Sequence, residues 1–171
     1  MKRFLLILML IAATVTVQAQ RYAVIDTKYI LNKLPEYKDA DKKLQQISDQ
    51  WQKDIDDKQA ELNRMYKNYD AEQFMLSDEL KKKRETELFN KEKEVRDLQK
   101  KRFGYEGDLF KERQKLVKPI QDKVYNAIQK IAVAKVYDFI LDKSEGITVI
   151  FADPKLDKSE DVLRELGIKA N

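Results

Sequence analysis

The sequence contains no histidine and no cysteine, and only four glycines and three prolines among its 171 residues. The absence of both His and Cys excludes a Cys/His zinc site, a thiol nucleophile, a disulfide and a Ser–His–Asp triad. None of the glycine-rich phosphate-binding patterns occurs either. Asp54, Asp56 and Asp57 form a small acidic cluster, but adjacent residues on a helix point in different directions, which favours a solvated face. We therefore expect no catalytic residues, no bound metal and no cofactor.

Charge is abundant: 34 Lys and Arg stand against 30 Asp and Glu, and charged residues make up 37% of the chain. Aromatic residues reach 9%, which is more than a typical disordered chain carries. This combination is typical of long, solvated helices rather than of one compact core. Acidic residues interleave with the basic ones, so the charge pattern does not predict nucleic-acid binding.

The first 19 residues resemble an export signal. A basic start, Met1–Arg3, precedes an apolar run from Phe4 to Ala13, which is shorter than the roughly 20 residues that a transmembrane helix needs. Val17 and Ala19 occupy the two positions that a signal peptidase recognises, so we predict cleavage after Ala19. An uncleaved membrane anchor is the alternative. An exported chain without cysteine favours the bacterial periplasm.

The segment 36–118 has the pattern of a helical hairpin. It contains no proline, and apolar residues recur at steps of three, four and seven from Leu44 through Trp51 and Leu62 to Tyr69. In its second half, Leu88, Val95, Leu109 and Leu116 follow one heptad track, and Phe89, Phe103, Phe110 and Val117 follow the neighbouring track. We call these the first track and the second track.

A turn near residues 73–78 should divide this segment into two limbs of similar length. Ser77 is a good N-cap, and Asp78 and Glu79 place negative charge in the next first turn, where the helix dipole favours it. We expect the second limb to be one helix that contains Gly104 and Gly107 and that is kinked at Pro119. The two glycines are either hinge points or positions where the limbs approach closely.

The remaining residues, 20–35 and 119–171, predict a small β-rich body, so the fold class is α+β. Strands are expected at Tyr22–Asp26 and Tyr137–Asp142, with a returning strand at Ile147–Ala152, and a short helix at Thr27–Leu34. Asp157 and Glu160 form a capping box for a last helix that ends at Gly167. A body this small with apolar strand edges should assemble with further copies.

The order of these segments resembles the Skp/OmpH family of periplasmic chaperones. The residues that carry the resemblance are Tyr22–Thr27, Leu34–Tyr37, the charged hairpin, the passage from Pro119 to Asp142, and Val162–Ile168. The resemblance implies a homotrimer whose strands build a small barrel. It further implies arms that enclose a cavity for unfolded outer-membrane proteins, without ATP and without catalytic residues. Candidate trimer-interface residues are then Val24, Ile25, Phe139, Leu141, Val149 and Phe151.

Under this hypothesis, part of the arm surface contacts client proteins. Phe74, Met75 and Leu76 at the tip are either packing residues or an exposed apolar contact. The basic run Lys81, Lys82, Lys83 and Arg84 is either a solvated face or a contact for anionic lipid, lipopolysaccharide or acidic client segments. The full set of candidate client contacts is Met65, Tyr66, Tyr69, Phe74, Met75, Leu76, Phe89 and Phe103.

A structural coiled-coil protein of the cell envelope, serving as a spacer or an assembly adaptor, is the alternative function. The two hypotheses differ in the surface of the arm. A spacer should bury its apolar residues in one seam, whereas a chaperone that holds unfolded chains should leave a second set exposed, such as Tyr66, Phe89 and Phe103.

Overall fold

The computed structural model describes residues 20–144, 146 and 149–169, which form two compact units. One unit is Leu34–Lys123, and the other combines the described residues up to Lys33 with those from Val124 onward. The predicted signal peptide, residues 1–19, lies outside the described residues.

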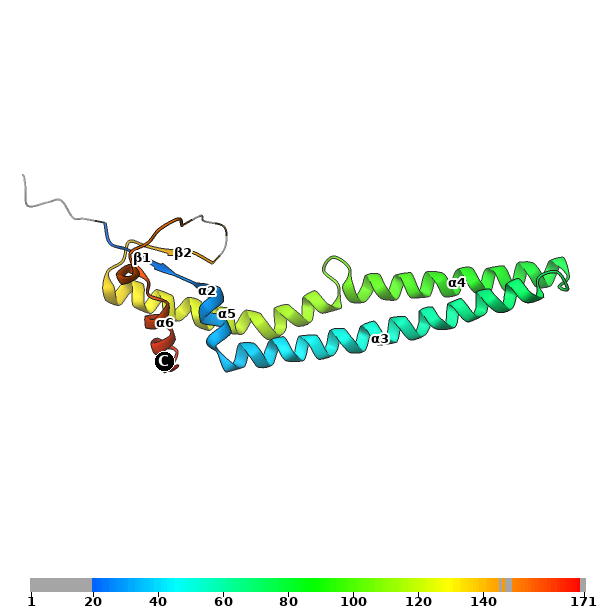
Figure 1. Cartoon of the computed structure of the whole chain (residues 1–171), viewed down its shortest axis with the longest axis horizontal. Coiled ribbons are helices and arrows are strands. Elements are labelled where there is room, and N and C mark those ends of the chain that lie inside the picture. The colour runs from blue at the N-terminus through cyan, green and yellow to red at the C-terminus, as the bar shows by residue number, and fades with distance from the viewer. Residues whose placement is uncertain (1–19, 145, 147–148, 170–171) are drawn as a thin grey trace, which may run out of the picture. The chain divides into compact units, whose positions relative to one another are not determined.

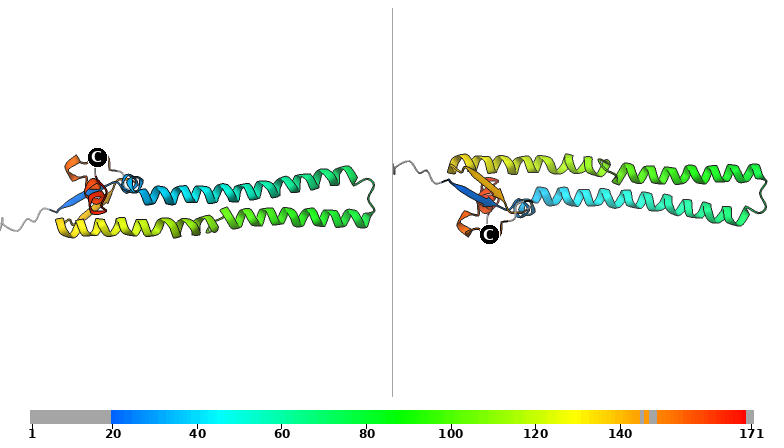
Figure 2. Two further views of the ribbon diagram at one scale, coloured as in Figure 1. Left: turned by 90° about the horizontal axis from the view of Figure 1, so that it is seen from below. Right: turned by 90° about the horizontal axis from the view of Figure 1, so that it is seen from above.

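Two long helices dominate the unit Leu34–Lys123: α3 (Pro35–Glu72) and α4 (Asp78–Phe103) (Figure 1). Both views of Figure 2 show α4 running beside α3 in the opposite direction. Leu44, Ile55 and Leu62 of α3 are buried, as are Leu88 and Val95 of α4. The helices expected on the two sides of Ser77 are therefore present, and their apolar stripes form the seam.

The turn between α3 and α4 spans residues 73–77. The backbone N–H of Gln73 continues the helical pattern by donating to Tyr69 O, and that of Met75 donates to Glu72 O. The hydroxyl oxygen of Ser77 accepts a hydrogen bond from the backbone N–H of Leu80, so the predicted N-cap is confirmed. Asp78 and Glu79 lie in the first turn of α4, where the helix dipole favours negative charge.

The second limb is not one helix, so the expectation that Gly104 and Gly107 lie inside a helix was wrong. α4 ends at Phe103, and α5 (Asp108–Lys135) begins after a loop of residues 104–107. A Cβ atom at Gly104 would lie 2.3 Å from the carbonyl oxygen of Lys100, and one at Gly107 would lie 2.8 Å from that of Lys101. The glycines are required because the backbone folds tightly onto the end of α4. We call residues 104–107 the break.

The buried track changes across the break. Leu88 and Val95, on the first track, are buried before it, whereas Val117 and Val124, on the second track, are buried after it. The break therefore shifts the apolar stripe by one residue, from the first track to the second.

Pro119 lies inside α5, and the division between the units falls just beyond it, at Lys123. The predicted kink at Pro119 stays a prediction.

The other unit contains a two-stranded parallel sheet. β1 (Tyr22–Ile25) pairs with β2 (Phe139–Asp142) so that Tyr22 lies opposite Phe139 and Ile25 opposite Asp142. The predicted returning strand is not present, because Val149–Ala152 are not in a strand, while Ile147 and Thr148 lie outside the described residues. Instead, Val24 bridges to Asp157, and the N–H of Lys158 donates to Val24 O. This contact takes the edge of β1 that β2 leaves open.

Two short helices pack together beside this sheet. α2 (Thr27–Lys33) and α6 (Ser159–Glu165) bury Ile30, Val162 and Leu163 almost completely. A short 3-10 helix, η2 (Pro154–Leu156), precedes α6. The end of α6 has the predicted glycine: Gly167 has a φ of +80°, and the N–H of Ile168 donates to Leu163 O. This is a Schellman C-cap.

Candidate functional site

The tip of the arm exposes two large apolar side chains. Phe74 is 87% exposed and Met75 is 80% exposed, whereas Leu76 is half-buried. Only Leu76 is thus partly covered at the turn, and the other two project into solvent. An apolar surface of this kind at a helical turn has no role in holding the two limbs together.

Tyr66 and Tyr69 connect the two limbs through their hydroxyl groups. The Tyr69 hydroxyl donates to Glu85 at 2.6 Å, and that of Tyr66 donates to Glu92 at 3.4 Å. The hydrogen bond to Glu85 is the main cause that raises the pKa of Tyr69, whereas partial burial is the main cause for the pKa of Tyr66. Met65 is half-buried beside Tyr69. These candidate client contacts therefore also stabilise the hairpin.

Phe89 and Phe103 lie on the same track, but the structure separates their environments. Phe89 is 59% exposed. Phe103 is half-buried and meets the Trp51 ring edge-to-face, with ring centroids 6.4 Å apart. Phe89 is therefore available on the surface, whereas Phe103 contributes to packing at the end of α4.

The basic run after the tip is largely solvated. Lys82, Lys83 and Arg84 are exposed and Lys81 is half-buried. Arg84 forms an ion pair with Glu87 at 3.0 Å, and within the described part of the chain the ammonium groups of Lys82 and Lys83 have no ion-pair partner. Contact of this run with anionic lipid or lipopolysaccharide stays a prediction.

Ion pairs between α3 and α4 fix the register of the limbs. Lys58 pairs with Glu94 at 2.5 Å, and Lys91 pairs with Glu61 at 2.7 Å. Hydrogen bonds from these lysines are the main cause that lowers the pKa values of Glu94 and Glu61. The Glu61 and Glu94 carboxylates are about half exposed, although the Lys91 side chain is 18% exposed, so solvent screens both pairs and each contributes little by itself. Together they add polar specificity to the apolar seam.

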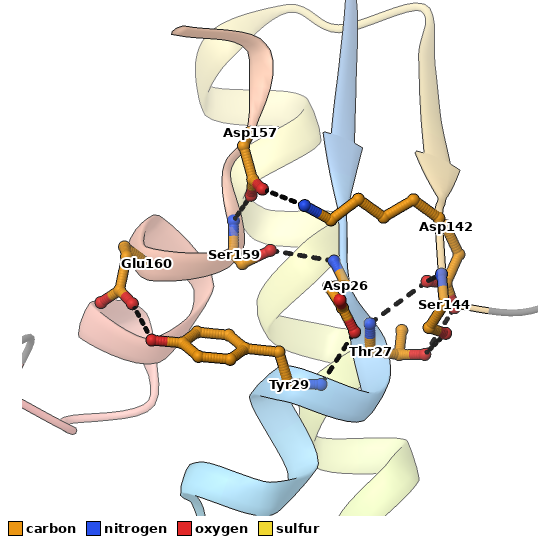
Figure 3. Close-up of polar contacts among 9 residues, drawn as sticks. Asp26, Thr27, Tyr29, Asp142, Ser144, Asp157, Ser159 and Glu160 are labelled. Atoms are coloured by element: carbon orange, nitrogen blue, oxygen red, sulfur yellow. Dashed lines mark hydrogen bonds and ion pairs between the residues drawn. The ribbon is translucent and has the colours of Figure 1, made fainter. Parts of the chain in front are cut away.

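A polar cluster holds the C-terminal segment against β1 and α2 (Figure 3). Ser159 Oγ accepts from the backbone N–H of Asp26, and Asp157 accepts from Lys143 Nζ at 2.7 Å. The predicted capping box was wrong. α6 begins at Ser159 with Lys158 at the N-cap position. Asp157 accepts from the N–H of Ser159, and the Glu160 carboxylate accepts from the Tyr29 hydroxyl. The sequence contains no signal for this long-range partner.

The second half of the cluster fixes the end of β2. Asp142 accepts hydrogen bonds from the hydroxyl and the backbone N–H of Thr27, and from the N–H of Ser144 (Figure 3). Three segments that are far apart in the sequence are thereby joined by hydrogen bonds, of which those to Ser159 and Asp142 are half-buried and that between Tyr29 and Glu160 is exposed. These hydrogen bonds give the cluster a structural role. One buried side-chain oxygen of the cluster, Glu160 Oε2, has no hydrogen-bond partner among the described residues.

The candidate trimer-interface residues differ in exposure. Val24 and Ile25 are buried within the single chain, and Leu141 and Val149 are half-buried. Phe139 is 55% exposed and Phe151 84% exposed. Sequence reasoning missed further exposed apolar side chains in this unit, although each stands in an apolar passage. They are Tyr125, Val133, Val136 and Ile150.

Two features are absent from the described residues. No group of acidic side chains there is arranged to hold a metal ion. No helix there combines the length and the apolar character needed to span a bilayer.

The comparisons with known proteins agree on one family. A sequence model of the family described as outer membrane protein (OmpH-like) matches residues 21–166. A crystal structure of an OmpH-like protein from Caulobacter crescentus, described as a proposed outer membrane chaperone, has the same fold, with a TM-score of 0.69 and 17% sequence identity. That likeness covers 90% of this chain and 89% of the other. No curated protein sequence matches. On the match over residues 21–166, the chain belongs to the OmpH-like family.

Proposed function

We propose that the chain is an ATP-independent periplasmic holdase that binds unfolded outer-membrane proteins between helical arms and prevents their aggregation. The observation that carries this proposal is the second set of apolar side chains on the arm. Phe74, Met75 and Phe89 are more than half exposed, although the seam between α3 and α4 is already formed by buried residues. A spacer built only for coiled-coil packing has no use for them.

Family membership and the structural neighbour support the same proposal. The neighbour's description names an outer membrane chaperone, and this chain shares its fold. Unfolded clients are varied and mostly apolar, so a surface of scattered aromatic and methionine side chains suits them better than one shaped pocket. Many weak contacts also allow release without a nucleotide.

An aggregation assay tests this function. A urea-unfolded outer-membrane β-barrel is diluted into buffer with and without the purified protein, and light scattering is recorded. We expect the protein to suppress scattering, and the triple variant Phe74→Ser, Met75→Ser, Phe89→Ser to lose most of that suppression. The matched control replaces three exposed polar residues of the arm, Lys67→Ser, Asn90→Ser and Gln99→Ser. Equal scattering with and without the unchanged protein would contradict the proposal.

We further propose that the body unit assembles the protein into a homotrimer. Phe139, Ile150 and Phe151 are exposed in the single chain, and β2 has one unpaired edge in the sheet that the structure describes. Burial of about 100 Å² of apolar surface is worth roughly 2.5 kcal/mol, so three copies of such a patch favour association. A trimer also provides three arms to surround a client.

Light scattering with mass determination tests this assembly. We expect the mass of three chains at micromolar concentration and dissociation in Phe151→Glu, since the charge would enter the shared interface. Lys155→Glu, an exposed change in the same segment, serves as the control. A single-chain mass for the unchanged protein would rule out the trimer.

A further inference from the structure

A groove lies between α3 and the junction of α4 with α5, within the unit Leu34–Lys123. It encloses about 350 Å³, and its walls are the side chains of Leu44, Phe103, Leu109 and Phe110. Asp41, Gln45, Ser48 and Arg113 surround it. The volume lies near the lower end of the range for small-ligand pockets. It has room for a large side chain.

The groove exists because the seam changes track at this point. Leu109 continues the first track and Phe110 the second, and neither is fully buried: Leu109 is half-buried and Phe110 is 47% exposed. Away from the break, one track forms the seam and its side chains are almost fully buried. The exposed fraction is 4% or 5% for Leu88, Val95 and Val117. At the changeover, neither track closes the seam, so apolar walls stay open to solvent.

The break itself is well fastened, so the groove has a defined shape. The Arg102 guanidinium pairs with Asp108 across the break at 2.7 Å and lies over the Trp51 ring. The N–H of Gly107 donates to Gly104 O, and that of Lys111 donates to Gly107 O. The walls are therefore held by side-chain and backbone contacts on both sides of the break.

Two charged side chains at the rim of the groove form no polar contact with the rest of the described residues. Among the residues that the structure describes, neither Asp41 nor Arg113, which both line the groove, has an ion pair or a side-chain hydrogen bond. Arg113 offers a cation to an aromatic ring, and Asp41 offers an acceptor to a hydroxyl or an indole N–H. The groove thus combines an apolar floor with one donor and one acceptor at its edge.

We propose that this groove binds a tyrosine or tryptophan side chain of an unfolded polypeptide. This rests on the holdase function proposed above and names the client side chains that this site would select. Tyr and Trp have an apolar body for the walls and a polar group for the rim. A leucine would satisfy only the walls, and a charged side chain would leave them uncovered.

A titration with small probes tests the proposal directly. N-acetyl-tyrosinamide and N-acetyl-leucinamide are added to the ¹⁵N-labelled protein, and amide chemical shifts are followed. We expect the shifts to gather around Leu44, Leu109 and Phe110, and the tyrosine probe to bind about threefold more tightly than the leucine probe, because of the cation–π contact. Shifts gathered elsewhere, or equal affinity for the two probes, would overturn the proposal.

Two variants and one control sharpen this result. Phe110→Ala should weaken binding of the tyrosine probe at least threefold, whereas Tyr105→Ala, an aromatic residue of the break that is 98% exposed and does not line the groove, should not. Arg113→Met keeps the walls and removes the cation, so it should reduce the preference for tyrosine and leave leucine binding unchanged. If Arg113→Met kept the preference, the proposed recognition would be wrong.

The same variants separate this inference from the holdase function. If the unchanged protein fails to suppress barrel aggregation, the holdase function fails, but the tyrosine titration still decides whether the groove binds aromatic side chains. If the protein suppresses aggregation and Phe110→Ala suppresses it equally well for a barrel rich in tyrosine, the groove is not a client site. We expect Phe110→Ala to lose more suppression with that barrel than with one poor in tyrosine.

Discussion

The Arg102 guanidinium lies 4.4 Å from the centroid of the Trp51 ring, so a cation covers the only tryptophan of the chain. Arg102 stands on the first track, where a leucine or valine would continue the seam. Its guanidinium instead stacks on Trp51 and pairs with Asp108, and both ionic side chains are less than one third exposed. One residue thereby joins α3, the end of α4 and the start of α5.

Replacing Arg102 with Gln should destabilise the arm. The change removes the cation–π contact and the ion pair with Asp108, and we expect a loss of about 1–2 kcal/mol in the free energy of unfolding. Urea unfolding followed by Trp51 fluorescence measures it, and the native emission should also shift. Arg96→Gln is the matched control, because Arg96 is exposed and its ion pair is with Glu92, one turn away on the same helix. A loss as large in the control would argue against a special role for Arg102.

Gly104→Ala and Glu106→Gly should have opposite effects on stability. An alanine Cβ at position 104 would collide with the carbonyl oxygen of Lys100, so we expect a loss of at least about 1 kcal/mol. Glu106 has a φ of +52°, a left-handed conformation that glycine adopts more easily, so its replacement should gain about 0.5–1 kcal/mol. Thermal unfolding of both variants measures the signs. A stabilised Gly104→Ala would show that the break can become helical.

Tyr69→Phe should weaken the pairing of the two limbs near the tip. It removes the hydroxyl that donates to Glu85 at 2.6 Å, a bond to a charged acceptor worth about 1.5 kcal/mol. Tyr66→Phe removes only the longer 3.4 Å contact with Glu92 and should cost less. Amide hydrogen exchange in residues 66–72 and 85–92 provides the measurement. If both variants lost the same protection from exchange, the shorter Tyr69–Glu85 hydrogen bond would not be the stronger of the two.

The body should lose stability in acid. Burial alone would raise the pKa values of Asp142 and Asp157, but the hydrogen bonds that they accept outweigh it and hold both pKa values below the usual range. A lowered pKa adds stability above the unfolded-state pKa of about 3.9, and that stability is lost as pH falls through the folded-state value. We therefore expect the free energy of unfolding to decrease below about pH 4.

Asp157→Asn identifies one source of this acid sensitivity. The variant should be less stable than the unchanged protein at neutral pH, and its stability should fall less steeply between about pH 4 and 2, because one titrating group is gone. Urea unfolding at several pH values gives both quantities. Asp39→Asn, an exposed change on α3, serves as the control. An unchanged slope in Asp157→Asn would mean that other carboxylates cause the loss.

Much of the arm could be predicted from local sequence. The spacing from Leu44 to Tyr69 predicts an amphipathic helix, and Ser77 with Asp78 and Glu79 predicts where the next helix begins, because capping involves only neighbouring residues. The two tracks of the second limb were also visible. Which of the two tracks is buried could not be predicted, since this depends on the facing helix. The groove beside Phe110 could not be seen without that information.

In the unit that contains the sheet, several contacts could not be predicted from local sequence. The passage around Val149 has strand-like composition, yet Val149–Ala152 are not in a strand, although β2 keeps an unpaired edge in the described sheet. Instead, Asp157 and Lys158 take the open edge of β1, because strand pairing depends on contacts that local composition does not contain. The bond from Tyr29 to Glu160 likewise joins residues 131 positions apart. No local pattern encodes it.

The sequence by itself determined the two helices on either side of Ser77, the turn at residues 73–77, the cap at Gly167 and the absence of His and Cys chemistry, because these depend on residue type and short-range spacing. The tertiary structure decided that β1 and β2 run parallel, that Gly104 and Gly107 form a break, and that the seam changes track there. These outcomes depend on contacts between segments far apart in the chain. Their energies are set by the shape and charge of the partner surface, which no single segment specifies.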